Sequence, residues 1–117
     1  MPIKIYIDPQ KIEGDIMENW NKNLPHLTDE IREDCNEFCK YDKGILVESS
    51  EIHSEPEKGI ITWETPYAKR QYYEIKTAHK KEGHPNATWR WFHKAKAKKI
   101  KEWKLKAQRC LEGKLLQ

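Results

Sequence analysis

The residues best placed for chemistry are two cysteines and two histidines with spacings found in zinc sites. Cys35 and Cys39 are four residues apart, and His79 and His84 are five residues apart further along the chain. Two thiolates followed by two imidazoles at such spacings can hold a structural zinc ion. Cys35, however, falls on an apolar helical stripe, and 39 residues separate Cys39 from His79. We therefore interpret both cysteines as small buried residues and expect neither a metal nor a cofactor.

The remaining polar residues do not form a catalytic pattern. The sequence has no ordered Ser-His-Asp set with a nucleophile turn, no Gly-rich phosphate loop and no Asp-x-Asp metal motif. His79, His84 and His93 lie near many lysines, as a small nuclease would require, but histidines scattered along a polar loop are more often exposed bystanders. The sequence therefore predicts a protein that is not an enzyme.

Charge is divided unevenly between the two parts of the chain. Residues 1–75 carry 9 Lys and Arg against 16 Asp and Glu, a net charge of −7, whereas residues 76–117 carry 13 against 3, a net charge of +10. Such a dipolar chain suits head-to-tail contacts between identical subunits, or contact with nucleic acid on one side only; a solvated basic helix is the plain alternative. The lysines that we expect to contact nucleic acid or an acidic partner are Lys80, Lys81, Lys94, Lys98 and Lys101.

Aromatic residues within the basic part offer a further route to nucleic acid. In the run from Trp89 to Lys94, rings alternate with basic side chains, as on surfaces that stack single-stranded bases. On a helix, however, Trp89 and Phe92 share the buried face, which leaves Trp91 and the basic residues outside. We therefore keep a nucleic-acid-binding module as the alternative function and treat Trp91 as a candidate protein contact.

Length and composition indicate one small domain, residues 1–117. Hydrophobic residues make up 37% and charged residues 35%, which suits a subunit that gains stability by packing against neighbours. The N-terminal residues lack an apolar signal region, and no apolar run approaches the ~20 residues that cross a membrane. We expect a soluble, cytosolically made protein that contacts no membrane and keeps Cys35, Cys39 and Cys110 as free thiols.

The first part of the chain predicts a strand and a long helix. Isoleucines at every second position make residues 2–7 a strand with one buried face. Apolar residues then recur at helical spacing from Ile16 to Phe38, and this helix should stop near Lys40. Because Pro25 interrupts the pattern, we expect a kink or a restart there, with residues 28–30 favouring a fresh N-terminus.

The middle of the chain predicts the rest of the sheet. Residues 44–50 are ambiguous, and a strand should follow at about 50–55. Residues 55–59 form a turn, with Pro56 at its second position and Gly59 at its exit, that joins this strand to another at 60–64. Together with the N-terminal strand, the hairpin predicts a small antiparallel sheet of three or four strands.

The residues from Trp63 onward predict a join between the sheet and a short helix. Thr65 can cap the first helical turn, and Pro66 suits the first helical position. We expect Trp63 and Tyr67 to anchor this join, with Tyr67 on the buried face of the helix. The buried face should comprise Tyr67, Ala68, Gln71, Tyr72 and Ile75, whereas Lys69, Arg70 and Tyr73 point elsewhere as candidate protein contacts.

The C-terminal part predicts a loop and a second long helix. Residues 76–87 are polar and basic without periodicity, so we expect a mobile loop there. Thr88 can cap a helix that runs from about 89 to 115, with Trp103 as a structural anchor on its apolar stripe. The predicted fold class is therefore α+β, a small antiparallel sheet of 3–4 strands packed against two longer helices and one short helix.

Three stretches carry a family resemblance. The most specific is Ile61-Thr62-Trp63-Glu64-Thr65-Pro66-Tyr67-Ala68-Lys69-Arg70-Gln71-Tyr72-Tyr73, and the others are Asp42-Lys43-Gly44-Ile45-Leu46 and the closing segment with Pro85, Trp91-Phe92 and Lys101-Glu102-Trp103. In order and spacing they resemble the minor capsid proteins of long-tailed bacteriophages, which belong with the neck and head–tail connector components. The resemblance spans roughly residues 30–107. It departs from the family at Cys39-Lys40, where a proline is more usual, and in the Lys-rich loop before Pro85.

This resemblance implies a structural virion protein. It implies a tail-terminator-like connector or neck component that forms a homo-oligomeric ring at the head–tail junction, assembled in the host bacterial cytoplasm. The partners it implies are copies of the chain itself and other phage connector, stopper or tail-end proteins, with non-specific DNA contact as a further expectation. In such a ring we place Lys69, Arg70, Tyr73 and Trp91 at the subunit contact.

Overall fold

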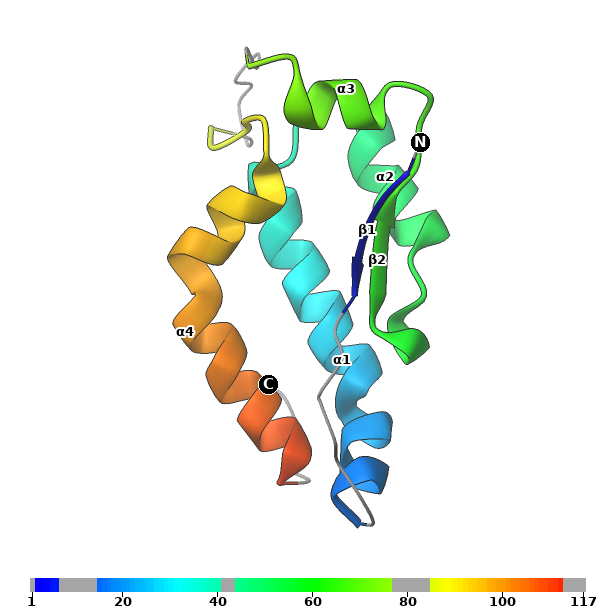
Figure 1. Ribbon diagram of the computed structural model, residues 1–117, viewed down its shortest axis with the longest axis vertical. Coiled ribbons are helices and arrows are strands. Elements are labelled where there is room, and N and C mark those ends of the chain that lie inside the picture. The colour runs from blue at the N-terminus through cyan, green and yellow to red at the C-terminus, as the bar shows by residue number, and fades with distance from the viewer. Residues whose placement is uncertain (1, 7–14, 41–43, 77–84, 113–117) are drawn as a thin grey trace.

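The computed structural model describes residues 2–6, 15–40, 44–76 and 85–112. These residues form two long helices, two short helices, a 3₁₀ turn and two strands, which confirms the predicted α+β class (Figure 1). No helix within these ranges is long and apolar enough to cross a membrane. In chain order the elements are β1 Ile3–Tyr6, α1 Asp15–Phe38, α2 Ile45–His53, the 3₁₀ turn η1 Pro56–Lys58, β2 Ile60–Trp63, α3 Ala68–Tyr73 and α4 Trp91–Leu111.

The two long helices, α1 and α4, pack side by side and run in opposite directions (Figure 1). The side chain of Asn19 near the start of α1 donates to the carbonyl of Leu111 at the end of α4, at 3.4 Å. At the other end, the amide of Thr88 donates to the carbonyl of Phe38, at 2.9 Å. The apolar stripes that the sequence predicted on these two helices therefore face each other and supply most of the core.

Helix α1 runs through Pro25 without the restart that the sequence predicted. The hydroxyl of Thr28 donates to the carbonyl of Leu24 at 2.8 Å, so it bonds to the preceding turn and does not cap a new helix. Leu24 and Leu27 are buried on both sides of the proline. Because the apolar stripe continues in phase through Pro25, tertiary packing outweighs the helix-breaking tendency of the proline.

The sheet of the described residues has two strands, so the prediction of three or four is wrong. Strands β1 and β2 are antiparallel, with Ile3 opposite Trp63 and Ile5 opposite Ile61. The predicted turn at residues 55–59 is present as η1, closed by Gly59 in the left-handed region at φ 71°. Most of the segment predicted as a strand at 50–55 instead belongs to helix α2, which ends at His53 and packs beside β2 (Figure 1). Glu55, at the end of that segment, forms an isolated β-bridge with Ile60.

Serine side chains explain why a helix takes the place of that strand. The hydroxyl of Ser54 accepts from the amide of Thr62 at 2.9 Å, and the hydroxyl of Ser49 accepts from the amide of Glu64 at 3.2 Å. These amides on the outer side of β2 are ones that a third strand would have bound. Leu46 and Ser50 complete the buried face of α2 at helical spacing. The serines satisfy the edge of β2 and leave no need for another strand.

Helix α3 begins at Ala68, two residues later than the sequence predicted. Thr65 contributes its carbonyl to the amide of Ala68 at 3.2 Å, while its own buried hydroxyl has no hydrogen-bond partner within the described residues. Tyr67 precedes the helix in a turn and is 41% exposed, so its expected place on the buried face is wrong. Ala68 and Tyr72 are buried as predicted.

Helix α4 also begins two residues later than predicted, at Trp91. Thr88 does not cap it, because the backbone before the helix is held elsewhere: Arg90, at φ 50°, donates its amide to the carbonyl of Tyr72 at 3.1 Å. Trp91 lies one turn before the buried Ala95, on the inner face of the helix. Trp91 is fully buried, and Trp89 is only half-buried, the reverse of the predicted arrangement.

Candidate functional site

An aromatic cluster holds the sheet and the helices in place. Trp63 of β2 packs edge-on against Trp91 of α4 at 5.8 Å between ring centroids, and Tyr72 of α3 packs against the same indole at 4.7 Å. All three side chains are buried. The indole nitrogen of Trp63 donates to Asn36 of α1 at 2.9 Å, and Asn36 in turn donates to Ser50 of α2 at 2.9 Å. Trp63 therefore packs on α4 and bonds to α1, and Asn36 extends the network to α2.

A second indole joins the two long helices. Trp103 is buried between them, stacks on Phe92 at 6.0 Å between ring centroids, and donates its Nε1 to Asp34 at 2.8 Å. An ion pair between Lys106 and Glu30, at 3.0 Å, lies beside it. Together these contacts fix which side of α4 faces α1 and which side lies open.

Lys40 closes the far end of α1. Its ammonium donates to the side chain of Gln71 at 2.9 Å and to the carbonyl of Ile75, so it ties α1 to the end of α3. Burial lowers the pKa of the Lys40 ammonium, against a smaller raising effect from Cys39. Lys40 is therefore a buried tether between the end of α1 and the segment that follows α3.

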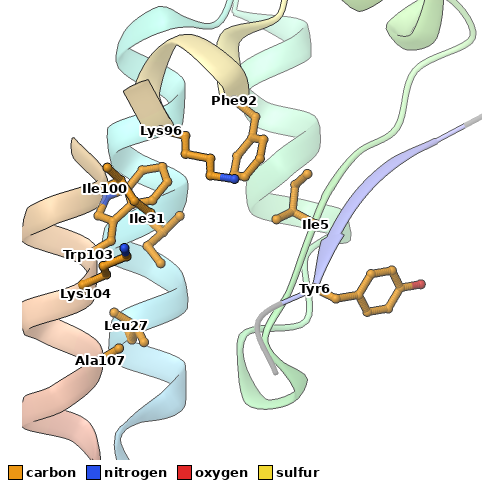
Figure 2. Close-up of a pocket in the computed structure, with 10 residues that line it drawn as sticks. All are labelled: Ile5, Tyr6, Leu27, Ile31, Phe92, Lys96, Ile100, Trp103, Lys104 and Ala107. Carbon is orange, nitrogen blue, oxygen red and sulfur yellow. The ribbon is translucent and has the colours of Figure 1, made fainter. Parts of the chain in front are cut away.

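An apolar groove lies between strand β1 and the two long helices (Figure 2). It has a volume of about 240 Å³, with Ile5 and Tyr6 of β1 on one side and residues of α1 and α4 on the other (Figure 2). Tyr6 is 66% exposed at its edge. The remaining lining residues are Leu27, Ile31, Phe92, Lys96, Ile100, Trp103, Lys104 and Ala107.

Two lysines add positive charge to the otherwise largely apolar lining of this groove. Lys96 and Lys104 are exposed, and neither has an ion-pair partner among the described residues. The position of Lys96 at the groove fits a side-chain stem that lies along apolar surface with its ammonium in solvent. The groove therefore combines an apolar lining with positive charge, which suits an apolar and acidic partner segment.

A second hollow adjoins the groove and includes two of the predicted contact residues. Lys69 and Tyr73 of α3 line it together with Lys4 of β1 and His93 of α4. It shares Ile5 and Phe92 with the first groove, so the two are continuous along β1. The hydroxyl of Tyr72, whose pKa is raised by burial, lies 2.5 Å from Nδ1 of His93 in this region.

Of the four residues that the sequence placed at a subunit contact, three are exposed in the structure and one is buried. Lys69 and Tyr73 are exposed beside the second hollow. Arg70 is also exposed but forms an ion pair with Glu74 at 3.7 Å. Trp91 is fully buried, so it cannot contact another protein, and that prediction is wrong. Trp91 faces inward because it packs against Trp63 and Tyr72, which come from elements far away in the sequence.

Three of the five lysines that were predicted to contact nucleic acid or an acidic partner lie within the described residues. Lys94, Lys98 and Lys101 are exposed on α4, and the ammonium of Lys98 lies 5.5 Å from the centre of the Phe38 ring. Lys80 and Lys81 lie outside the described residues, as do most residues of the loop expected at 76–87. Whether these lysines meet nucleic acid or an acidic protein remains a prediction.

The three cysteines are free and buried. Burial raises the pKa of the Cys35 and Cys39 thiols and raises that of Cys110 to about 11. Cys35 and Cys39 thus sit in the core as the sequence suggested. His79 and His84, the other half of the zinc pattern, lie outside the described residues.

Helix α2 presents an exposed surface that sequence reasoning missed. Ile45 is 49% exposed and Ile52 is 72% exposed, and Glu48 lies exposed between them. A helical reading of residues 45–53 would have found this surface, because positions seven apart share a helix face. The strand predicted at 50–55 concealed the pattern.

Comparison with known proteins finds one family. A family model described as minor capsid protein matches residues 3–111, which run from the start of β1 to the end of α4. No curated protein and no solved structure matches the chain.

Proposed function

Because the chain belongs to the minor capsid protein family, whose model matches residues 3–111, we propose that it is a connector component of a tailed-phage virion. It forms a homo-oligomeric ring in the neck, at the head–tail junction, and assembles in the host bacterial cytoplasm. Its partners are copies of itself and the connector, stopper or tail-end proteins next to it. The family is a structural one and implies no enzymatic activity.

The match to the minor capsid family carries this proposal, and the surface of the fold supports the ring. An apolar groove with exposed lysines at Lys96 and Lys104 remains unfilled by the described residues. Exposed apolar and acidic residues lie on a different element, α2. A subunit with two unlike contact surfaces can join identical copies head to tail, and such contacts form rings when the rotation closes.

Imaging of assembled particles tests the proposed position. Cryo-electron microscopy with symmetry analysis should find several copies of the chain in a ring between head and tail. A phage that lacks the gene should accumulate heads and tails that are not joined. Single copies at the junction, or none, would exclude the connector ring.

The exposed lysines of α4 support a second function, nucleic-acid binding by the basic C-terminal helix. Lys94 and Lys101 are seven residues apart and therefore share one face of α4. Contacts from such lysines to phosphates would be independent of base sequence and sensitive to salt. In a connector, this face would meet DNA in the passage between head and tail.

A further inference from the structure

The exposed face of helix α2 has the form of a short ridge that fits a groove. Ile45 and Ile52 lie two helical turns apart, roughly 10 Å along the axis, on one side of the helix. Both side chains are largely exposed, and Glu48 is exposed between them with no ion-pair partner among the described residues. We call Ile45, Glu48 and Ile52 the α2 ridge.

The groove beside β1 has an apolar lining and the opposite charge. Lys96 and Lys104 are eight residues apart on α4, so roughly 12 Å of helix separates them. Ile100 lies midway between them, and Leu27 and Ile31 of α1 line the groove with it (Figure 2). The α2 ridge thus has an apolar residue at each end and one carboxylate between them. The groove has an apolar lining and two ammonium groups.

We propose that the α2 ridge of one copy docks into the groove beside β1 of a second copy. Ile45 and Ile52 bury their side chains against Ile5, Ile100 and the apolar residues around them. Glu48 lies within reach of the two lysines and pairs with them. The inference rests on the proposed connector ring and names the subunit contact that closes it.

Charge and position favour a second copy over an unrelated occupant. Residues 1–75, which include α2, carry a net charge of −7, and residues 76–117, which include α4, carry +10. Helices α2 and α4 lie on opposite sides of the fold, with the sheet and α1 between them (Figure 1). A ridge and a groove on opposite sides cannot satisfy each other within one subunit. They make a heterologous contact that continues from copy to copy.

Mixing two complementary variants tests this contact. Ile52→Asp damages the ridge but leaves the groove intact, and the double variant Lys96→Glu/Lys104→Glu damages the groove but leaves the ridge intact. In sedimentation velocity at up to about 0.5 mM, a range that detects weak association, the wild-type chain should self-associate. Each variant alone should associate at least about tenfold more weakly, which corresponds to about 1.4 kcal/mol. An equimolar mixture should form dimers and nothing larger, because one ridge and one groove remain.

Charge exchange and a matched control sharpen the result. Glu48→Lys added to Lys96→Glu/Lys104→Glu should restore association, since the two charges trade places. The control Lys101→Glu/Leu105→Asp changes exposed residues of the same helix that do not line the groove, and it should associate like the wild type. All changed residues are exposed or line an open groove, so thermal unfolding should confirm that each variant is folded. A wild-type chain that stays monomeric at about 0.5 mM, or a mixture without dimers, overturns the proposal.

Cross-linking in assembled particles separates this contact from the connector function. A photoreactive amino acid at position 104 should cross-link to residues 45–52 of another copy of the chain. A cross-link from position 104 to a different virion protein overturns the docking proposal and leaves the connector function standing. Particles that contain no copies at the junction overturn the connector function, whereas the mixing experiment judges the contact by itself.

Discussion

Trp103 and Asp34, 69 residues apart in the chain, are joined by a 2.8 Å hydrogen bond from the indole Nε1 to a carboxylate oxygen. The bond crosses from α4 to α1 and fixes the rotation of α4 about its axis. With that rotation, Ile100 and Ala107 face strand β1 and line the groove. A bond within the core thus determines what the subunit presents on its surface.

Replacing indoles by phenyl rings tests this bond. Trp103→Phe removes the donor to Asp34 and should lower the free energy of unfolding by about 1–3 kcal/mol beyond the loss of packing. Trp91→Phe is the matched control, because the buried Nε1 of Trp91 has no partner within the described residues. Urea denaturation measures both. Equal losses for the two variants would show that the bond to Asp34 contributes no net stability.

Truncating two aromatic residues four positions apart should have unequal effects. Trp63 is completely buried, so Trp63→Ala should cost about 3–5 kcal/mol and lower the melting temperature sharply. Tyr67 is 41% exposed, and Tyr67→Ala should change stability by only about 0.5 kcal/mol. Differential scanning calorimetry checks both. A large loss for Tyr67→Ala would restore this residue as the anchor that the sequence predicted.

Buried thiols should make the fold sensitive to alkali. Burial raises the pKa of the Cys110 thiol from 9.0 to about 11 and also raises those of Cys35 and Cys39. Folded thiols with raised pKa values retain protons that the unfolded chain releases above pH 9. Their stabilisation is therefore fully present below pH 9 and is lost as the pH rises towards about 11.

The buried ammonium of Lys40 makes stability depend on pH in the opposite direction. The lowered pKa of Lys40 makes stability rise with pH up to its ordinary value of 10.5. Because three thiols oppose one amine, we expect a net decrease between pH 8.5 and pH 10.5, at up to about 1.4 kcal/mol per pH unit for each thiol that titrates only when unfolded. Urea unfolding across this range measures the slope. Cys110→Ala should flatten it, and an unchanged slope would contradict the assignment.

DNA binding by α4 should depend on charge position as well as on net charge. If the alternative function holds, filter binding at low salt should detect DNA, and affinity should fall linearly on logarithmic axes as salt increases. Lys94→Glu/Lys101→Glu should reduce that slope by about two, since two phosphate contacts are lost. Lys22→Glu/Lys58→Glu changes net charge equally on other elements and should have little effect. No binding at low salt would remove the nucleic-acid function.

The sequence predicted the elements whose periodicity is long and whose core faces are continuous. The stripe from Trp20 to Phe38 specified α1, and the alternation of Ile3 and Ile5 specified β1. The restart predicted at Pro25 is absent, because local propensity cannot show that packing on both sides of a proline holds one helix together. The outcome depended on α4, which is far away in the sequence.

The errors at α2 and at the start of α4 have a shared cause, which is side-chain or backbone bonding over long sequence distances. The outer amides of β2 are bound by Ser49 and Ser54, and no local pattern shows that hydroxyls will replace a strand. Likewise, the bond from Arg90 to the carbonyl of Tyr72 precedes the start of α4, and Trp91 packs inward against Trp63 and Tyr72. The α2 ridge was missed because the strand predicted at 50–55 concealed its helical spacing. The groove could not be predicted because its lining comes from β1, α1 and α4, which are far apart in the sequence.

The same serines matter for the subunit before it joins a particle. Open strand edges are templates for uncontrolled pairing between chains. Because Ser49 and Ser54 occupy the outward amides of Glu64 and Thr62, β2 offers no free edge there. Two copies that paired through their β1 edges would leave no further strand edge at which the sheet could be extended. The serines thereby remove the β2 edge as a starting point for endless growth of the sheet into fibres.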